Sequence, residues 1–173
     1  MKKSLLFSLQ DRPTVLVSAC LLGKKCRYDG KKTVNPSLLF YKDLINFIPF
    51  CPEQLGGLPT PRPASNIFGG DGMDVIMGKA KVINVEGKDV TENFKLGAYK
   101  SLELALRYNP ILSIMRKKSP SCGIQTPYCE AKNGMGVTAA LFKLYKIKMI
   151  ECAPNDLLIY TGAFLMLLNP SQV

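Results

Sequence analysis

The sequence contains no histidine among its 173 residues. This absence excludes a Ser-His-Asp triad, a Cys-His dyad, zinc chemistry of the HExxH type and any imidazole metal ligand. Proton transfer must therefore come from carboxylates, lysine, tyrosine, cysteine or a bound cofactor. Tryptophan is absent too, so stacking on a nucleobase would depend on the seven tyrosines and eight phenylalanines.

Long apolar runs are also missing. No run reaches the ~18 apolar residues that cross a bilayer, and the apolar part of residues 1–10 is too short for a secretory signal. We therefore expect a cytoplasmic protein without a membrane partner. In that compartment the six cysteines are expected as thiols, metal ligands or catalytic groups rather than disulfides.

Acidic residues are scarce relative to basic ones, at 13 against 23, which gives a net charge of +10. Such a balance suits an anionic partner, for example a nucleotide or a nucleic acid. The one compact basic run, from Arg116 to Lys118, is too short for a nucleic-acid-binding arm. The charge is thus compatible either with solvated faces or with a positive field that attracts an anionic substrate.

Hydrophobic patterning predicts strands that alternate with helices. The expected strands are residues 14–19, 47–50, 111–115 and 147–152, and the expected helices are 38–47, 92–109, 136–146 and 155–168. This order is typical of right-handed βαβ units, and it predicts a three-layer α/β fold with a mostly parallel sheet and helices on both faces. Alternating residues at 74–91 predict a small β-hairpin insertion. We expect a single domain over 1–173, with a core of about 14–152 and a C-terminal helical extension at 153–173.

Three cysteines follow the ends of three predicted strands. Cys20 and Cys51 end the first and second strands, and Cys122 lies a few residues beyond the third. Loops at the carboxyl ends of parallel strands converge on one crevice. Thiolates without imidazole select zinc, copper(I) or an iron–sulfur cluster, and a [4Fe–4S] cluster held by three thiolates keeps one iron open. The alternative is that these cysteines are small buried hydrophobic residues.

The other three cysteines give weaker signals. Cys26 follows Cys20 by six residues, and it is either a fourth thiol near the site or a residue that packs the loop. Cys129 and Cys152 lie outside such loops, so we expect both to be structural.

Several polar residues lie close to these cysteines. Glu53 is a candidate general acid or base, or else a cap of loop amides. Ser119 and Ser121 flank Pro120, where a hydroxyl can donate to a substrate or cap the next turn. Arg62, between two prolines, can bind an anion or lie in solvent. We take Ser121 and Arg62 as the candidate substrate-binding residues.

Six sequence blocks together resemble the DUF523 family. They are SACLLG from Ser18, CRYDG from Cys26, CPEQLGGLPTPR from Cys51, DVT from Asp89, SPSCG from Ser119 and GVTAAL from Gly136. The blocks follow the order of the family and cover about residues 14–152. This family includes thiouracil desulfidases, which remove sulfur from thiolated pyrimidines with an oxygen-sensitive [4Fe–4S] cluster.

The resemblance implies a function and the residues that perform it. Cys20, Cys51 and Cys122 match the cysteines that hold the cluster, Glu53 matches a proton-handling acid, and Ser119 matches a serine near the substrate. The expected activity is removal of sulfur from a thiolated pyrimidine base, nucleoside or nucleotide, by a monomer or small homo-oligomer. Residues 126–132 depart from the usual family pattern, which leaves the substrate preference open. The alternative is a non-catalytic zinc- or nucleic-acid-binding module.

Overall fold

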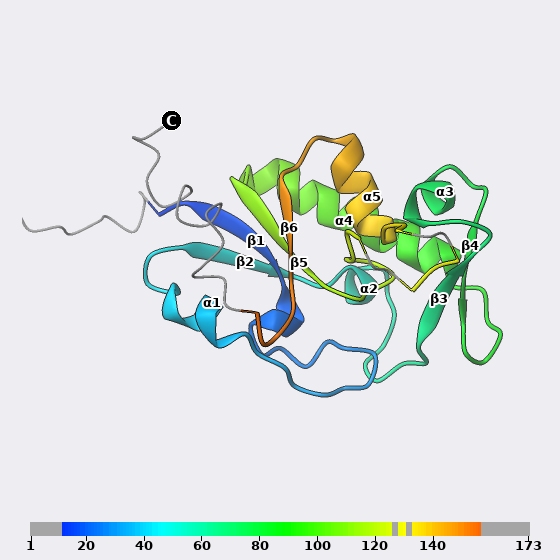
Figure 1. Ribbon diagram of the computed structural model, residues 1–173, viewed down its shortest axis with the longest axis horizontal. Coiled ribbons are helices and arrows are strands. Elements are labelled where there is room, and N and C mark those ends of the chain that lie inside the picture. The colour runs from blue at the N-terminus through cyan, green and yellow to red at the C-terminus, as the bar shows by residue number, and fades with distance from the viewer. Residues whose placement is uncertain (1–11, 126–127, 131–132, 157–173) are drawn as a thin grey trace, which may run out of the picture.

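The computed structural model of the protein describes residues 12–125, 128–130 and 133–156. Its centre is a four-stranded sheet in the order β2-β1-β5-β6, in which every neighbouring pair is parallel (Figure 1). The strands are β1 (Thr14–Ser18), β2 (Asn46–Phe50), β5 (Leu112–Arg116) and β6 (Met149–Cys152). All four strands predicted from apolar and β-branched runs are therefore present.

Helices cover both faces of this sheet. The described helices are α1 (Pro36–Phe40), α2 (Pro52–Leu55), α3 (Gly72–Ile76), α4 (Thr91–Tyr108) and α5 (Val137–Leu144), and a 3-10 turn, η2 (Ala19–Leu21), follows β1. Side chains alternate along β1, so Val15 and Val17 pack with the apolar cluster on the α1 side. Leu16 packs on the opposite face with the cluster of α4 and α5. The three-layer α/β arrangement is thus confirmed.

The α4–α5 layer supplies the larger apolar cluster. Phe94 of α4 and Phe142 of α5 have no solvent-exposed surface, and burial of each such side chain stabilises the fold by ~1.5–3 kcal/mol. Asn109, in the left-handed conformation with φ 42°, ends α4 before Pro110. Both long helices were predicted from their spacing, within two residues at each end.

The predicted hairpin exists, but its first strand was placed wrongly. The antiparallel pair is β3 (Ser65–Phe68) with β4 (Lys81–Asn84), whereas the prediction began at residue 74. The segment between them forms α3, because Asp71 accepts from the main-chain N–H groups of Met73 and Asp74 while Asp74 caps the Asp71 N–H in return. This capping box outweighs the alternation of apolar residues.

Two other expectations need comment. The helix predicted over 38–47 ends at Phe40 and is followed by turns. The predicted C-terminal helix falls, from residue 157 on, outside the described residues, so it stays a prediction, as does the division into core and extension. None of the helices described here is long and apolar enough to span a membrane.

Candidate active site

The loops at the carboxyl ends of β1, β2 and β5 enclose one pocket of about 380 Å³. Cys20 reaches it from η2, Cys51 from the residue after β2, and Cys122 from the loop after β5. The predicted convergence of the three cysteines is therefore present. Cys26 also lines the pocket, which favours the fourth-thiol interpretation over simple loop packing.

The loop that carries Cys122 is held by its own hydrogen bonds. Ser119 Oγ accepts from the N–H groups of Ser121 and Cys122, at 3.2 and 3.1 Å. The Ser121 carbonyl accepts in turn from Thr138 at the start of α5. Gly136 makes this contact possible, because a Cβ there would lie 2.5 Å from the Ser121 carbonyl. Residues 136–138 therefore fix the position of the loop that carries Cys122.

Hydrogen bonding among the thiols sets their proton affinities. Hydrogen bonding from Cys26 lowers the pKa of Cys20, against the effect of burial, and lowers the pKa of Cys51 to about 7. As the donor, Cys26 itself has a pKa raised far above its ordinary value. Burial raises the pKa of Cys122, and a hydrogen bond from the Ser18 hydroxyl works in the opposite direction. Cys26 is thus the centre of the thiol group.

Glu53 lies on the pocket wall and is held by Arg62. Arg62 Nε donates to Glu53 Oε2 at 2.6 Å, and the two side chains are only 4% and 15% exposed. Nη1 of Arg62 donates to the Pro59 carbonyl and to the Thr60 hydroxyl, and Nη2 donates to the Cys26 carbonyl at 3.0 Å. Arg62 lines the pocket, and every nitrogen of its guanidinium is engaged by protein, which gives it a positioning role for Glu53. Its expected contact with substrate stays a prediction.

The two serines of the SPSCG block lie differently. Ser119 lines the pocket, and because its oxygen accepts two N–H groups, its own proton remains to be donated. Ser121 is 1% exposed, is not among the residues that line the pocket, and its hydroxyl has no hydrogen-bond partner among the described residues. The structure therefore does not place Ser121 on the pocket wall, and its expected role in substrate binding stays a prediction.

Cys129 and Cys152 do not line the pocket. Cys129 is partly buried against the larger apolar cluster. Cys152 is fully buried, lies 3.1 Å from Asn35 Nδ2, and has a pKa raised to about 12, chiefly by burial. Both placements agree with a structural role.

Sequence reasoning did not single out several residues on the pocket wall. Arg116 lines the pocket, and its place directly after a predicted strand is the sequence signal that indicates this position. Arg27 and Lys118 also line the pocket. Arg27 forms a bidentate ion pair with Asp29, from Nε to Oδ1 at 2.9 Å and from Nη2 to Oδ2 at 2.7 Å. Three cations therefore line the pocket that holds the thiols, in addition to Arg62.

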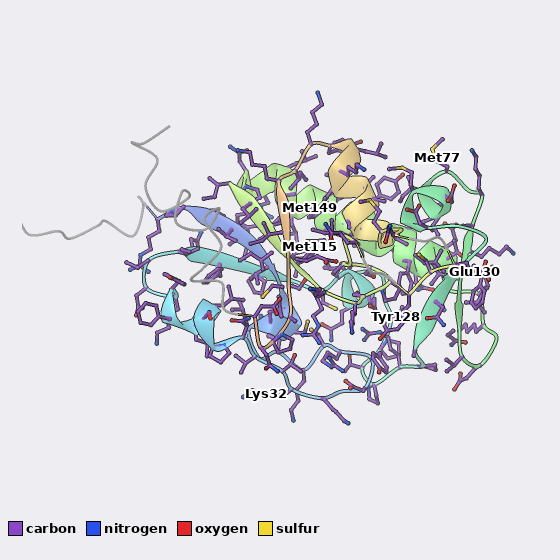
Figure 2. The ribbon with its side chains drawn as sticks, in the orientation of Figure 1. Lys32, Met77, Met115, Tyr128, Glu130 and Met149 are labelled. Atoms are coloured by element: carbon purple, nitrogen blue, oxygen red, sulfur yellow. The ribbon has the colours of Figure 1, made fainter. Side chains whose placement is uncertain are left out.

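Two tyrosines lie at the same pocket, and neither was predicted from sequence. Tyr28 and Tyr128 are 46% and 55% exposed. Figure 2 shows Tyr128 beside β3, where its carbonyl accepts from Ile67 N–H at 2.9 Å. Glu130, two residues further on, accepts from Gly69 N–H at 2.8 Å. These bonds anchor residues 128–130 to the hairpin.

A metal centre requires donor atoms that lie close together and match the chemistry of the metal. Among the described residues, no three Cys, Asp or Glu side chains are grouped so as to bind a metal ion. The pocket nevertheless presents four thiols, which come from three separate loops, without imidazole and with cations on the same wall. Soft thiolate ligands suit iron–sulfur clusters, and the cations offset the negative charge of such a group. In ligand chemistry the residues therefore fit the cluster that the sequence resemblance implies.

Fold and site together define an α/β protein with a thiol-lined pocket at the carboxyl edge of a parallel sheet. The family model described as 2-thiouracil desulfurase matches residues 15–152. The chain therefore belongs to this family, of the DUF523 type, as the sequence blocks indicated.

Two relatives illustrate the similarity. The chain is 40% identical over 150 residues to "Uncharacterized protein YbbK" of Bacillus subtilis (strain 168), a match that covers 83% of this chain and 99% of the relative. Among solved structures it resembles a "[4Fe-4S]-dependent thiouracil desulfidase TudS", with a TM-score of 0.72 and 33% identity, over 90% of this chain and 99% of the other.

Proposed function

We propose that the protein is a [4Fe–4S]-dependent desulfidase that converts a thiolated pyrimidine and water into the corresponding pyrimidine and sulfide. The observation that carries the proposal is the convergence of Cys20, Cys51 and Cys122 on one pocket that also holds Glu53 and Ser119. Family membership and the similarity to the thiouracil desulfidase TudS support the same conclusion.

The three cysteines are the proposed cluster ligands. When bound, the cluster supplies an open iron that polarises the carbon–sulfur bond as a Lewis acid. Thiols must lose their protons to bind iron, and hydrogen bonds from Cys26 favour the thiolates of Cys20 and Cys51. Cys26 is therefore assigned to support of the ligands, and not to the ligand set.

Glu53 and Ser119 are the proposed catalytic residues. Because Arg62 holds Glu53 Oε2, Oε1 is the oxygen that we assign to the attacking water, from which it accepts a proton. Ser119 has its hydroxyl proton available, and we assign it as a donor to a heteroatom of the pyrimidine ring. A positioned acid–base residue typically contributes ~10²–10⁴-fold to the rate.

The substrate class follows from the size and charge of the pocket. A volume of about 380 Å³ is enough for a pyrimidine ring. Arg27 and Lys118 on the wall can receive a phosphate, and the net charge of +10 favours a nucleotide over the free base. We also propose a cytoplasmic location and a monomer or small homo-oligomer as the working form.

Turnover by the anaerobically reconstituted protein tests the proposal. 2-Thiouracil, its nucleoside and its nucleotide are compared, and we expect pyrimidine and sulfide in equal amounts, with the highest kcat/KM for the nucleotide at low salt. Glu53→Gln is expected to lower kcat by ~10²-fold or more, whereas Glu103→Gln, on the exposed side of α4, serves as the matched control.

The alternative functions make different predictions. A zinc module would bind one zinc without colour and without turnover. A nucleic-acid-binding module would show an affinity that falls steeply with salt and, again, no turnover. Absence of turnover on all three substrates by protein loaded with four irons would contradict the desulfidase proposal.

A further inference from the structure

The part of the pocket wall that the hairpin supplies differs from the part that carries the thiols. The thiols come from the loops after β1, β2 and β5, whereas β3 contributes Ser65 and Asn66, and Tyr128 lies beside β3 (Figure 2). We call these three residues the hairpin wall. They carry neither charge nor thiol, so this wall suits a neutral part of a ligand rather than a phosphate or a metal.

The side chains of Asn66 and Tyr128 lie on the same face of the hairpin. Residues 128–130 run parallel to β3, because Ile67 N–H donates to the Tyr128 carbonyl at 2.9 Å and Ile67 forms a parallel bridge with Cys129. Ile67 is fully buried, and Cys129 packs against the same apolar cluster. Side chains alternate along a strand, so the residues that precede these two face the other way. Both Asn66 and Tyr128 line the pocket, in agreement with this alternation.

The carboxamide of Asn66 is available to a ligand. Its main chain is fixed by the hairpin, where it is in register with Ile83. Within the described ranges its side chain forms no hydrogen bond with the protein, and of the described residues that line the pocket it alone carries a carboxamide. A carboxamide holds N–H donors beside a carbonyl acceptor in one plane. This arrangement is complementary to the edge of uracil at which N3–H lies beside O4.

We infer that Asn66 and Tyr128 form the base-recognition element of the pocket. Tyr128 presents its ring to a face of the pyrimidine, and Asn66 hydrogen-bonds with the N3–H and O4 edge, next to the reacting sulfur at C2. Proteins read an isolated base by such a combination of stacking and hydrogen bonds to its Watson–Crick edge. The inference rests on the proposed desulfidase function, and it narrows the substrate to 2-thiolated pyrimidines whose N3 carries no substituent.

The first test measures product binding and does not depend on turnover. Uridine 5′-monophosphate and its 3-methyl analogue, which lacks N3–H, are titrated by calorimetry into the anaerobically reconstituted protein. We expect the wild type to bind the unmethylated nucleotide about tenfold more tightly, as for a bidentate contact with a base. Asn66→Leu should lower this ratio to about twofold or less, because a side chain of similar size then has neither donor nor acceptor.

Variants of Tyr128 should give a different result. Tyr128→Ala should weaken the binding of both nucleotides about fivefold or more, with the ratio between them unchanged, whereas Tyr128→Phe keeps the ring and should keep the affinity. Asn46→Leu, at an exposed asparagine of β2 outside this pocket, is the matched control and should bind as the wild type does. Asn66 is exposed as well, so the Tm of Asn66→Leu should stay close to the wild-type value.

The binding data can overturn the inference in three ways. Equal affinity of the wild type for the two nucleotides, or no binding of either, would show that the N3–H edge is not read. An undiminished ratio in Asn66→Leu would show that another group reads it. Unchanged affinity in Tyr128→Ala would exclude stacking on Tyr128.

The second test uses turnover of 2-thiouridine 5′-monophosphate. Asn66→Leu should raise KM about tenfold with kcat nearly unchanged, because the lost contact is made equally in the ground state and the transition state. A loss confined to kcat would overturn the inference. Wild-type enzyme without turnover would contradict the proposed function, whereas the calorimetric ratio would still decide whether Asn66 reads the base.

Discussion

Replacement of Arg62 by methionine is the perturbation whose cost follows most directly from the structure. The substitution keeps the aliphatic stem but removes the charge that pairs with Glu53 Oε2 at 2.6 Å. The three other acceptors of the guanidinium, which include the Cys26 carbonyl, lose their donor as well. Because the two charged side chains are only 4% and 15% exposed, water replaces little of what is lost.

Removal of one partner from a buried ion pair typically costs ~3–5 kcal/mol. That is a large part of the ~5–15 kcal/mol that stabilises a domain. We therefore expect Arg62→Met to lower the free energy of unfolding by ~3–5 kcal/mol in urea denaturation of the metal-free protein, with an unchanged m-value. Glu53→Gln should cost less, because the amide oxygen still accepts from Nε.

The double variant refines this test. Arg62→Met combined with Glu53→Gln should cost less than the sum of the single changes, since no charge is then left unpaired. A loss below ~1 kcal/mol for Arg62→Met, the range of an exposed ion pair, would refute the reasoning. Strict additivity of the two changes would refute it as well.

Three further predictions concern the loops around the pocket. Gly136→Ala forces a Cβ to within 2.5 Å of the Ser121 carbonyl, so the iron bound after reconstitution should fall below half of the wild-type content. Gly87→Ala, whose Cβ would have nothing within 4 Å, should retain the wild-type iron content. Equal iron contents in the two variants would contradict this prediction. Ser18→Ala leaves the Arg116 N–H without its acceptor, so unfolding in urea should show a loss of ~1–3 kcal/mol, and an unchanged midpoint would count against the assignment. Arg27→Met should raise the pKa of Asp29 from about 2 toward ~3.9 in a carboxyl NMR titration, because the hydrogen bonds from Arg27 hold it down. The stability that the Asp29 carboxylate contributes is present above ~pH 4 and disappears as the pH falls toward 2. An Asp29 pKa that stays near 2 in Arg27→Met would contradict the assigned cause.

The sheet and the long helices were predictable because their signals are local and strong. Buried parallel strands appear as continuous β-branched runs, and the spacing of apolar residues in α4 identifies its buried face. The predicted position of the first hairpin strand was wrong because the apolar alternation from residue 74 on competes with the capping box of Asp71, which makes this segment helical.

The positions of the three cysteines were predictable from a general rule, since loops beyond the carboxyl ends of parallel strands converge. The direction of side chains within those loops was not. Ser121 and Cys122 are neighbours, yet only Cys122 lines the pocket. Arg62 could bind substrate according to its sequence context, but the fold places it within reach of Glu53 and the Cys26 carbonyl. Such contacts join segments distant in sequence, and no local pattern reveals them.

The most direct test of the account is an iron and sulfide count after anaerobic reconstitution, made together with an assay of thiouracil turnover. The account predicts about four irons and four sulfides per chain in the wild type, with turnover, and the same result for Cys129→Ala. Iron and turnover should both be lost in Cys20→Ala, Cys51→Ala and Cys122→Ala. Full iron content in any of these three variants, or zinc bound in place of iron in the wild type, would contradict the central claim.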